Sequence, residues 1–327
     1  MIVRWGLGEL PGVLGELAVE RPLLVTTRRW SGIEVPVVSG YDGALPHAGR
    51  AGVDGAAAAA EEVGADCLVA LGGGAAIDTA KAVSARTGLP VVSVPTTYSG
   101  AEWTDFFGVR DQEKQVKVGG AGAHVAGIVY EVELTLGLPR RESGGSALNA
   151  LAHCAEALYV NGRNAAADAE ALEGARLISA SLPSVLDHPE DREARGLLLE
   201  GAMHGGAAMA GAGLGLGHAM AQALGGRFGV SHGAANALCL PPAIRFTEPA
   251  AAEAVRAFGE AVGASDGAPG RVEELAGLAG YTRLRELGIP AEELGEAASA
   301  AAERAGAKAN LRRASAEEIA ELYRSVW

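Results

Sequence analysis

The sequence predicts an α/β domain with a parallel sheet, followed by an all-helical domain. At 327 residues the chain is long for a single domain, so two domains are expected. Short apolar runs alternate with helical segments in the first third of the chain, and strand-like segments stop after Pro139. Alternation of this kind is typical of a parallel sheet whose faces are covered by helices.

Each element of the first domain is indicated by a short apolar run or a periodic segment. Strands are predicted at 22–27, 34–38, 67–71, 90–94 and 128–139, helices at 53–63 and 75–86, and a polar hairpin at 106–119. The run 67–71 is continuously apolar, as expected of a strand that is buried on both faces of a sheet.

The rest of the chain has helical periodicity and an Ala/Leu/Glu-rich composition from about residue 144 onward. Breaks between helices are expected near 182–190, 225–231, 240–242, 265–270 and 288–290, where Gly and Pro gather. We therefore predict an α/β domain at 1–139 and an all-helical domain at 140–327.

Composition excludes several classes of protein. A net charge of −13 disfavours non-specific binding to nucleic acid or to anionic membranes. No apolar run reaches the roughly 18–20 residues that a membrane span needs, and the N-terminus does not resemble a signal peptide. The three cysteines, Cys67, Cys154 and Cys239, show no pairing pattern. Buried thiols in a reducing cytoplasm are expected.

Two polar or glycine-rich turns follow neighbouring predicted strands. Gly72-Gly73-Gly74 precedes a helix, where backbone without Cβ atoms can approach a phosphate and the helix N-terminus supplies N–H groups. The segment 95–100, PTTYSG, follows the next strand and offers two threonine hydroxyls. By themselves the two segments can equally be a tight turn and a capping turn, and Asp78 with Lys81 can be an ordinary ion pair.

Four residues of the second domain have the composition of a metal-ligand set. Asn149 and His153 are four apart, so a helix places them on one face. His218 and His232 are separated by a glycine cluster, so they come from different elements and can converge. Three imidazoles and one side-chain oxygen suit a first-row metal ion. An anionic Asp would be the expected oxygen ligand, and Asn149 is a weaker donor.

Four segments together resemble motifs of the iron-containing alcohol dehydrogenase superfamily. They are GGGAAIDTAKA, PTTYSGAEWT, the pair ending in His153, and HAMAQALGG…SHGAANALCLP. The resemblance implies a dinucleotide-binding α/β domain, a helical catalytic domain and the cofactor NAD(P)H. It places the following residues at the cofactor: Gly72, Gly73, Gly74, Asp78, Thr96, Thr97 and Ser99, with Thr26 after the first strand. It places Asn149, His153, His218 and His232 at metal-ligand positions, for Fe or Zn. His153, His218, His232 and Tyr98 are the candidate catalytic residues.

Within this superfamily the sequence is most similar to the maleylacetate reductase branch, in which Asn also replaces the Asp ligand. We therefore expect metal-free, NAD(P)H-dependent reduction of an unsaturated keto-dicarboxylate, maleylacetate to 3-oxoadipate, in aromatic-compound degradation. A metal-dependent alcohol dehydrogenase or aldehyde reductase is the alternative. A dehydroquinate synthase-like lyase and a non-catalytic dinucleotide-binding protein are minor ones. The resemblance also implies a cytoplasmic homodimer acting on a small carboxylate-bearing substrate.

No carboxylate follows the first predicted strand, where an acid that selects NAD over NADP would be expected. The chain there reads Thr26-Thr27-Arg28-Arg29, and the arginines could accept a 2′-phosphate or simply be solvated. We therefore expect both NADH and NADPH to serve as cofactor.

Overall fold

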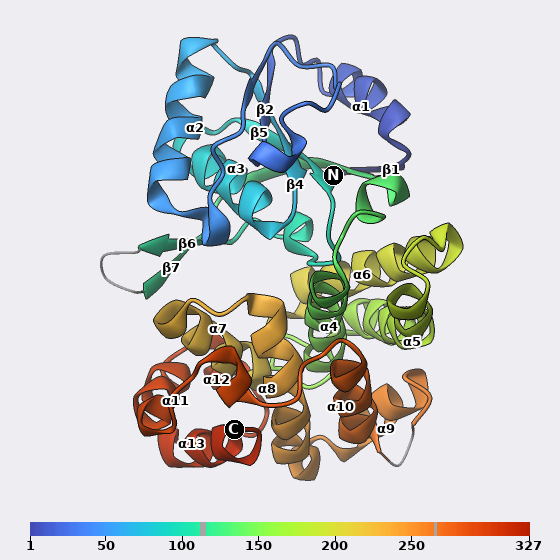
Figure 1. Cartoon of the computed structure of the whole chain (residues 1–327), viewed down its shortest axis with the longest axis vertical. Helices are drawn as coiled ribbons and strands as arrows, with labels where there is room; N and C mark the ends of the chain where they lie inside the picture. Colours follow the sequence, from blue (N-terminus) through green and yellow to red (C-terminus); the bar gives the residue numbers. More distant parts are fainter. Residues whose placement is uncertain (112–115, 265–266) are drawn as a thin grey trace. The chain divides into compact units, whose positions relative to one another are not determined.

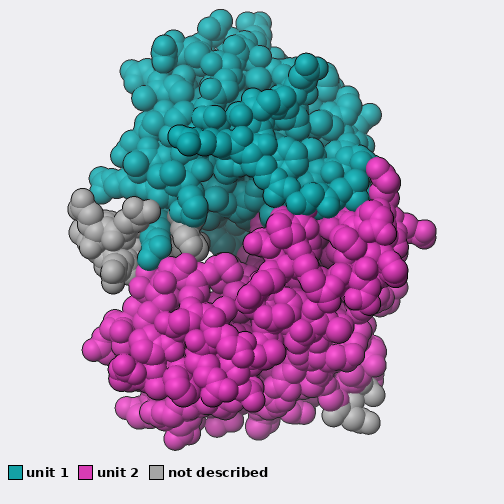
Figure 2. All heavy atoms as spheres, viewed as in Figure 1, with its two compact units in different colours: residues 1–97, 101–137 teal, residues 98–100, 138–327 magenta. Residues whose placement is uncertain are grey.

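A computed structural model describes residues 1–111, 116–264 and 267–327. The chain divides into two compact units, which Figure 2 shows in different colours. Unit 1 comprises Met1–Thr97 and Ala101–Gly137, and unit 2 comprises Tyr98–Gly100 and Leu138–Trp327. Three residues of the loop that follows the strand Pro90–Pro95 therefore pack with the helical unit.

Unit 1 is built on a parallel six-stranded sheet with the order β1-β8-β5-β4-β2-β3. Its strands are β1 (Ile2–Trp5), β2 (Pro22–Val25), β3 (Ser39–Tyr41), β4 (Cys67–Gly72), β5 (Pro90–Pro95) and β8 (His124–Tyr130). A separate antiparallel pair is formed by β6 (Phe107–Asp111) and β7 (Val116–Gly120). The parallel α/β architecture predicted for this part of the chain is confirmed.

Helices cover both faces of the sheet (Figure 1). Side chains of α2 (Arg50–Glu62) and α3 (Gly74–Thr87) pack with Leu23, Val25, Leu68 and Val91 in one apolar cluster. Side chains of α1 (Leu10–Glu16) pack with Leu24, Val69, Val92 and Val129 in the other. Successive residues of one strand thus point to opposite clusters, and both are apolar because both faces are buried.

Two strand predictions need correction, and one strand was not predicted. Residues 34–38 form no strand, and β3 lies downstream at Ser39–Tyr41; Pro36 has no N–H to donate to a ladder. The strand predicted at 128–139 begins earlier and ends at Tyr130, because Glu131 accepts the Glu133 N–H and starts a 3₁₀ turn. Strand β1 was not predicted, since its four residues, IVRW, include the charged Arg4 and form no continuous apolar run.

Unit 2 is helical. Its helices are α4 (Arg140–Ala157), α5 (Ala165–Asp187), α6 (Arg192–Ala212), α7 (Leu216–Phe228), α8 (His232–Thr247), α9 (Ala252–Ala261), α10 (Ala268–Leu278), α11 (Leu294–Ala302), α12 (Ala305–Ala309) and α13 (Ala316–Ser325). Helix α4 packs against α5, α6 and α8, and nearly every residue from Ser143 to Ala157 is buried. The all-helical prediction is confirmed. None of the helices in the described ranges has the length and apolarity needed to cross a membrane.

Glycine allows α5 and α6 to approach closely. A Cβ on Gly174 would lie 2.8 Å from Cys154 Sγ and 3.0 Å from the Gly201 carbonyl oxygen. A Cβ on Gly205 would lie 2.8 Å from the Ala150 carbonyl oxygen of α4. These contacts leave no room for a side chain, so the three helices form one tightly packed core.

Candidate functional site

The glycine turn of unit 1 forms an open cradle at the N-terminus of α3. Gly73 is the N-cap residue and supplies no side chain to the first-turn N–H groups, while Gly72 has a φ of 151°. A Cβ on Gly73 would lie 2.9 Å from Thr97 Cγ2. The Thr97 hydroxyl is buried, and no hydrogen-bond partner for it lies among the described residues. The cradle fits a pyrophosphate, which would accept from the helix N-terminus and from this hydroxyl.

Two other predicted cofactor residues hold the turn in place. The Thr26 hydroxyl donates to the Leu71 carbonyl oxygen at 2.6 Å, and it is almost fully buried. The Thr96 N–H donates to the Gly72 carbonyl oxygen at 3.0 Å. Both threonines therefore tie neighbouring strand ends to the glycine turn.

Asp78 has two partners within unit 1. Its carboxylate lies 3.3 Å from Lys81 Nζ and accepts the Gly108 N–H at 3.2 Å. Lys81 is buried and donates to the carbonyl oxygens of Ala101 and Phe106, each at 2.6 Å. This pair therefore anchors the segment between β5 and β6 to helix α3.

The predicted histidines converge in unit 2. The rings of His153 on α4 and His218 on α7 are stacked with centroids 4.7 Å apart, and His232 at the start of α8 lies 5.5 Å from His218. His153 and His218 are buried, and His232 is partly exposed. Burial, with the neighbouring His218, lowers the pKa of His153 well below its usual value. The His153 ring is therefore neutral near pH 7.

Hydrogen bonds determine how the Asn149 amide is turned. Its Nδ2 donates to the Ser99 carbonyl oxygen at 2.9 Å, and its Oδ1 accepts from Asn236 Nδ2 at 2.7 Å. The same Nδ2 lies 3.4 Å from His153 Nε2. An amide nitrogen can only donate, so His153 Nε2 accepts and the ring proton sits on Nδ1. The Asn149 oxygen is turned away from the imidazole, toward Asn236.

Glu156 lies against the histidine cluster and was not predicted from the sequence. It is fully buried, and one carboxylate oxygen lies 2.7 Å from His218 Nδ1. The carboxylate also accepts the Gly215 N–H at 2.7 Å and the His218 N–H at 3.0 Å, at the N-terminus of α7. Its spacing was the available signal, because Glu156 follows His153 by three residues and shares its helical face.

This donor set does not fit a resident metal ion. The lone pair of His153 Nε2 faces an amide N–H, and the Asn149 oxygen is taken by Asn236. Among the residues that the structure describes, no group of three His, Cys, Asp or Glu side chains has the arrangement of a metal site. Two ring nitrogens, His153 Nδ1 and His218 Nε2, are buried with no hydrogen-bond partner in the same ranges. Both nitrogens are therefore available to hydrogen-bond a polar ligand.

Tyr98 is buried in unit 2, with its hydroxyl 3.0 Å from Arg195 Nη1. The adjacent Ser99 contributes its carbonyl oxygen to Asn149, and its hydroxyl is buried with no hydrogen-bond partner in the described part of the chain. Tyr98 and Ser99 therefore pack beside the histidine cluster, within unit 2.

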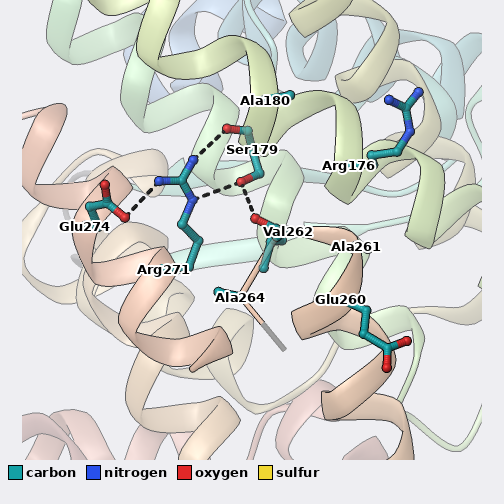
Figure 3. A pocket seen from close by; sticks show the side chains of 10 residues that line it. Arg176, Ser179, Ala180, Glu260, Ala261, Val262, Ala264, Arg271 and Glu274 are labelled. Atoms are coloured by element: carbon teal, nitrogen blue, oxygen red, sulfur yellow. Dashed lines mark hydrogen bonds and ion pairs between the residues drawn. The ribbon is translucent and has the colours of Figure 1, made fainter. Parts of the chain in front are cut away.

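A surface hollow elsewhere in unit 2 is lined by none of the predicted site residues (Figure 3). Its two arginines already have partners: Arg271 contacts Ser179 and Glu274, and Arg176 pairs with Glu173. The hollow therefore shows no unmatched charge for a ligand.

Comparison with known proteins identifies the family. A model of iron-containing alcohol dehydrogenase matches residues 6–126, and a model of the C-terminal part of the Fe-containing alcohol dehydrogenase family matches residues 145–327. A maleylacetate reductase of Sphingobium indicum is 38% identical over 263 residues, which are 80% of this chain and 74% of that protein.

Comparison with solved structures supports the same family. An iron-containing alcohol dehydrogenase from Corynebacterium glutamicum superposes with a TM-score of 0.91 at 29% identity, covering 100% of this chain and 94% of that one. A maleylacetate reductase from Agrobacterium tumefaciens superposes with a TM-score of 0.90 at 30% identity, covering 100% and 95%. The chain therefore belongs to the iron-containing alcohol dehydrogenase family.

Proposed function

We propose that the chain is an NAD(P)H-dependent oxidoreductase that reduces maleylacetate, an unsaturated keto-dicarboxylate, to 3-oxoadipate without a bound metal. Relatives named maleylacetate reductase that are 33–39% identical over most of the chain support the substrate class. The structural observation that carries the proposal is the orientation of Asn149, whose amide nitrogen, not its oxygen, faces His153.

The glycine turn is the proposed pyrophosphate site. Gly72, Gly73 and Gly74 leave the first turn of α3 open, and the Thr97 hydroxyl supplies a further donor. A dihydronicotinamide bound to the enzyme supplies hydride to an electron-poor carbon. Thr26 and Thr96 keep the strand ends and the turn in register.

The histidine cluster is the proposed catalytic site. Reduction of a conjugated double bond places negative charge on the carbonyl oxygen of the substrate, and preorganised donors stabilise such charge most effectively where water is excluded. Asn149 holds the His153 proton on Nδ1, and Glu156 holds the His218 proton on Nδ1. The unfilled His153 Nδ1–H can donate to a substrate oxygen. The proton that completes the reduction comes from solvent, and His218 Nε2 can take it up and pass it to the substrate carbon.

Both NADH and NADPH are the proposed reductants. Arg28 and Arg29 follow β2 and are exposed, and no carboxylate stands beside them in the sequence. The Arg29 guanidinium already donates to the Gly137 carbonyl oxygen at 2.5 Å, which makes Arg28 the better candidate for a 2′-phosphate. A kinetic preference of more than about 100-fold for NADH, a difference of about 2.7 kcal/mol, would refute this part of the proposal.

The deciding experiment measures NAD(P)H oxidation with maleylacetate on protein treated with a strong chelator. We expect turnover that neither chelation nor added Fe²⁺ or Zn²⁺ changes. Activity on simple aldehydes or alcohols that appears only with added metal would replace the proposal with a metal-dependent alcohol dehydrogenase. In that case His218 Nε2 and His232 would be the remaining ligands. A homodimer is a separate prediction, which the molar mass from light scattering tests directly.

A further inference from the structure

Arg195 is a buried cation in the core of unit 2. Its side chain is fully buried, and it comes from the first turn of α6. Its hydrogen-bond partners among the described residues are all uncharged: the Pro189 carbonyl oxygen at 2.5 Å, the Tyr98 hydroxyl at 3.0 Å and the Ser143 hydroxyl at 3.5 Å. Its Nη2 is buried and has no partner in the same ranges.

Such an arrangement costs free energy, because a buried charge without a carboxylate partner is poorly compensated. A neutral apolar side chain of similar size would fill the same space without that cost. What the guanidinium adds is a directed hydrogen bond to Tyr98, a residue 97 positions away in the sequence. This contact fixes one end of the segment Tyr98–Gly100, which packs with unit 2.

The other end of that segment lies against the histidine cluster. The Ser99 carbonyl oxygen accepts from Asn149 Nδ2, which also faces His153 Nε2. Gly100 has a φ of 70°, and a Cβ there would lie 3.3 Å from His153 Nδ1 and 3.2 Å from the Cα of Gly206. A small shift of the segment Tyr98–Gly100 would therefore change both the orientation of the Asn149 amide and the space around the His153 ring.

We propose that Arg195 is a positioning residue for the histidine cluster. It holds the Tyr98 hydroxyl, so that the Ser99 carbonyl keeps the Asn149 amide, and hence the Nδ1–H tautomer of His153, in place. Tyr98 then acts as an anchor and does not touch the substrate. The inference rests on the proposed function only for its kinetic readout, since the tautomer is measured on the protein alone.

The test compares Arg195→Met, Tyr98→Phe and the double variant. We expect each single variant to lower kcat about 10- to 100-fold, as a displacement of about 1 Å does, with an unchanged KM for NAD(P)H. The double variant should be no slower than the slower single variant, because both changes break one linkage. It should also be more stable than Tyr98→Phe alone, which leaves the buried guanidinium without its hydroxyl partner.

Nitrogen NMR of the histidines supplies the second readout. We expect His153 to be protonated on Nδ1 in the natural protein and to gain Nε2-protonated tautomer in both single variants. Tyr281→Phe is the matched control, because it removes another hydroxyl of unit 2, one that donates to the Arg141 carbonyl oxygen at 2.8 Å. It should change neither kcat nor the His153 signal.

Three outcomes would overturn the inference. Lower thermal stability with unchanged kcat and unchanged His153 tautomer would make Arg195 merely structural. A loss of kcat in Tyr98→Phe that multiplies with that of Arg195→Met would make Tyr98 a separate catalytic group. An unchanged tautomer in both single variants would break the proposed linkage. If the natural protein does not reduce maleylacetate, the NMR and stability results still decide.

Discussion

Replacing Glu156 by Gln should disrupt the histidine cluster and the start of α7 together. The carboxylate accepts three N–H groups, from the His218 ring, the His218 backbone and the Gly215 backbone, at 2.7, 3.0 and 2.7 Å. A carboxamide has one accepting oxygen, and its NH₂ group must face at least one of these donors. The substitution therefore creates a buried clash between donors in a fully buried position.

The expected loss of stability follows from these contacts. One hydrogen bond to a charged acceptor contributes about 1.5–3 kcal/mol, and an anion at a helix N-terminus adds roughly 0.3–2 kcal/mol. We expect Glu156→Gln to lower the free energy of unfolding by about 2–5 kcal/mol. For a protein of this size that corresponds to a fall in Tm of roughly 4–20 °C.

Catalysis should suffer as well, because a neutral amide holds the His218 ring less firmly than a carboxylate does and removes the negative charge beside it. We expect kcat to fall at least about tenfold, as when partners that orient a reactive imidazole are removed. Glu170→Gln is the matched control, since Glu170 contacts His204 Nδ1 at 2.5 Å in a pair that is 42% and 20% exposed. It should cost less than about 1 kcal/mol and leave kcat unchanged.

The assays are thermal unfolding by circular dichroism and steady-state oxidation of NAD(P)H. A Glu156→Gln protein with the natural Tm and a kcat within about twofold of the natural value would refute the reasoning. So would a Glu170→Gln protein that loses as much stability as Glu156→Gln, because burial would then not decide the strength of the pair.

Four further substitutions test unit 1 and the helix packing. Burial raises the pKa of the Glu102 carboxyl from 4.5 to about 7. The folded state therefore binds this proton more tightly than the unfolded state, and the protein loses stability as the pH rises from 4.5 to 7. Glu102→Gln should remove a pH-dependent loss of about 3 kcal/mol between pH 4.5 and 7, measured by urea unfolding, and an unchanged pH slope would contradict this. Gly174→Ala should destabilise the protein by about 1–3 kcal/mol, because its Cβ would meet Cys154 Sγ. Gly277→Ala on α10 has open space around it and should stabilise the protein by about 0.4–1 kcal/mol. The midpoints of urea unfolding of the two variants and the natural protein measure both effects. Gly73→Ala should raise the Kd for NAD(P)H about tenfold by pushing on Thr97, and an unchanged Kd in fluorescence titration would place the pyrophosphate elsewhere.

Local patterns in the sequence determined the fold class and the placement of Asn149 and His153 in the candidate site. Continuous apolar runs such as 67–71 must be buried on both faces, and they became the central strands of a parallel sheet. The spacing of Asn149 and His153 placed them on one face of α4, because a helix turns every 3.6 residues. Where a run contained Pro36 or ended at a capping residue such as Glu131, the same patterns misplaced the strand.

Only the tertiary structure decided which distant residues meet. Glu156 meets His218 across 62 positions, Asn149 meets Asn236 across 87, and Tyr98 meets Arg195 across 97. Local periodicity indicates which face of a helix is buried but not which helix covers it, and the partner is set by how the helices pack. The turn of the Asn149 amide, and with it the proton position on His153, follows from these long-range contacts, because each amide atom must match the donor or acceptor that packing places beside it.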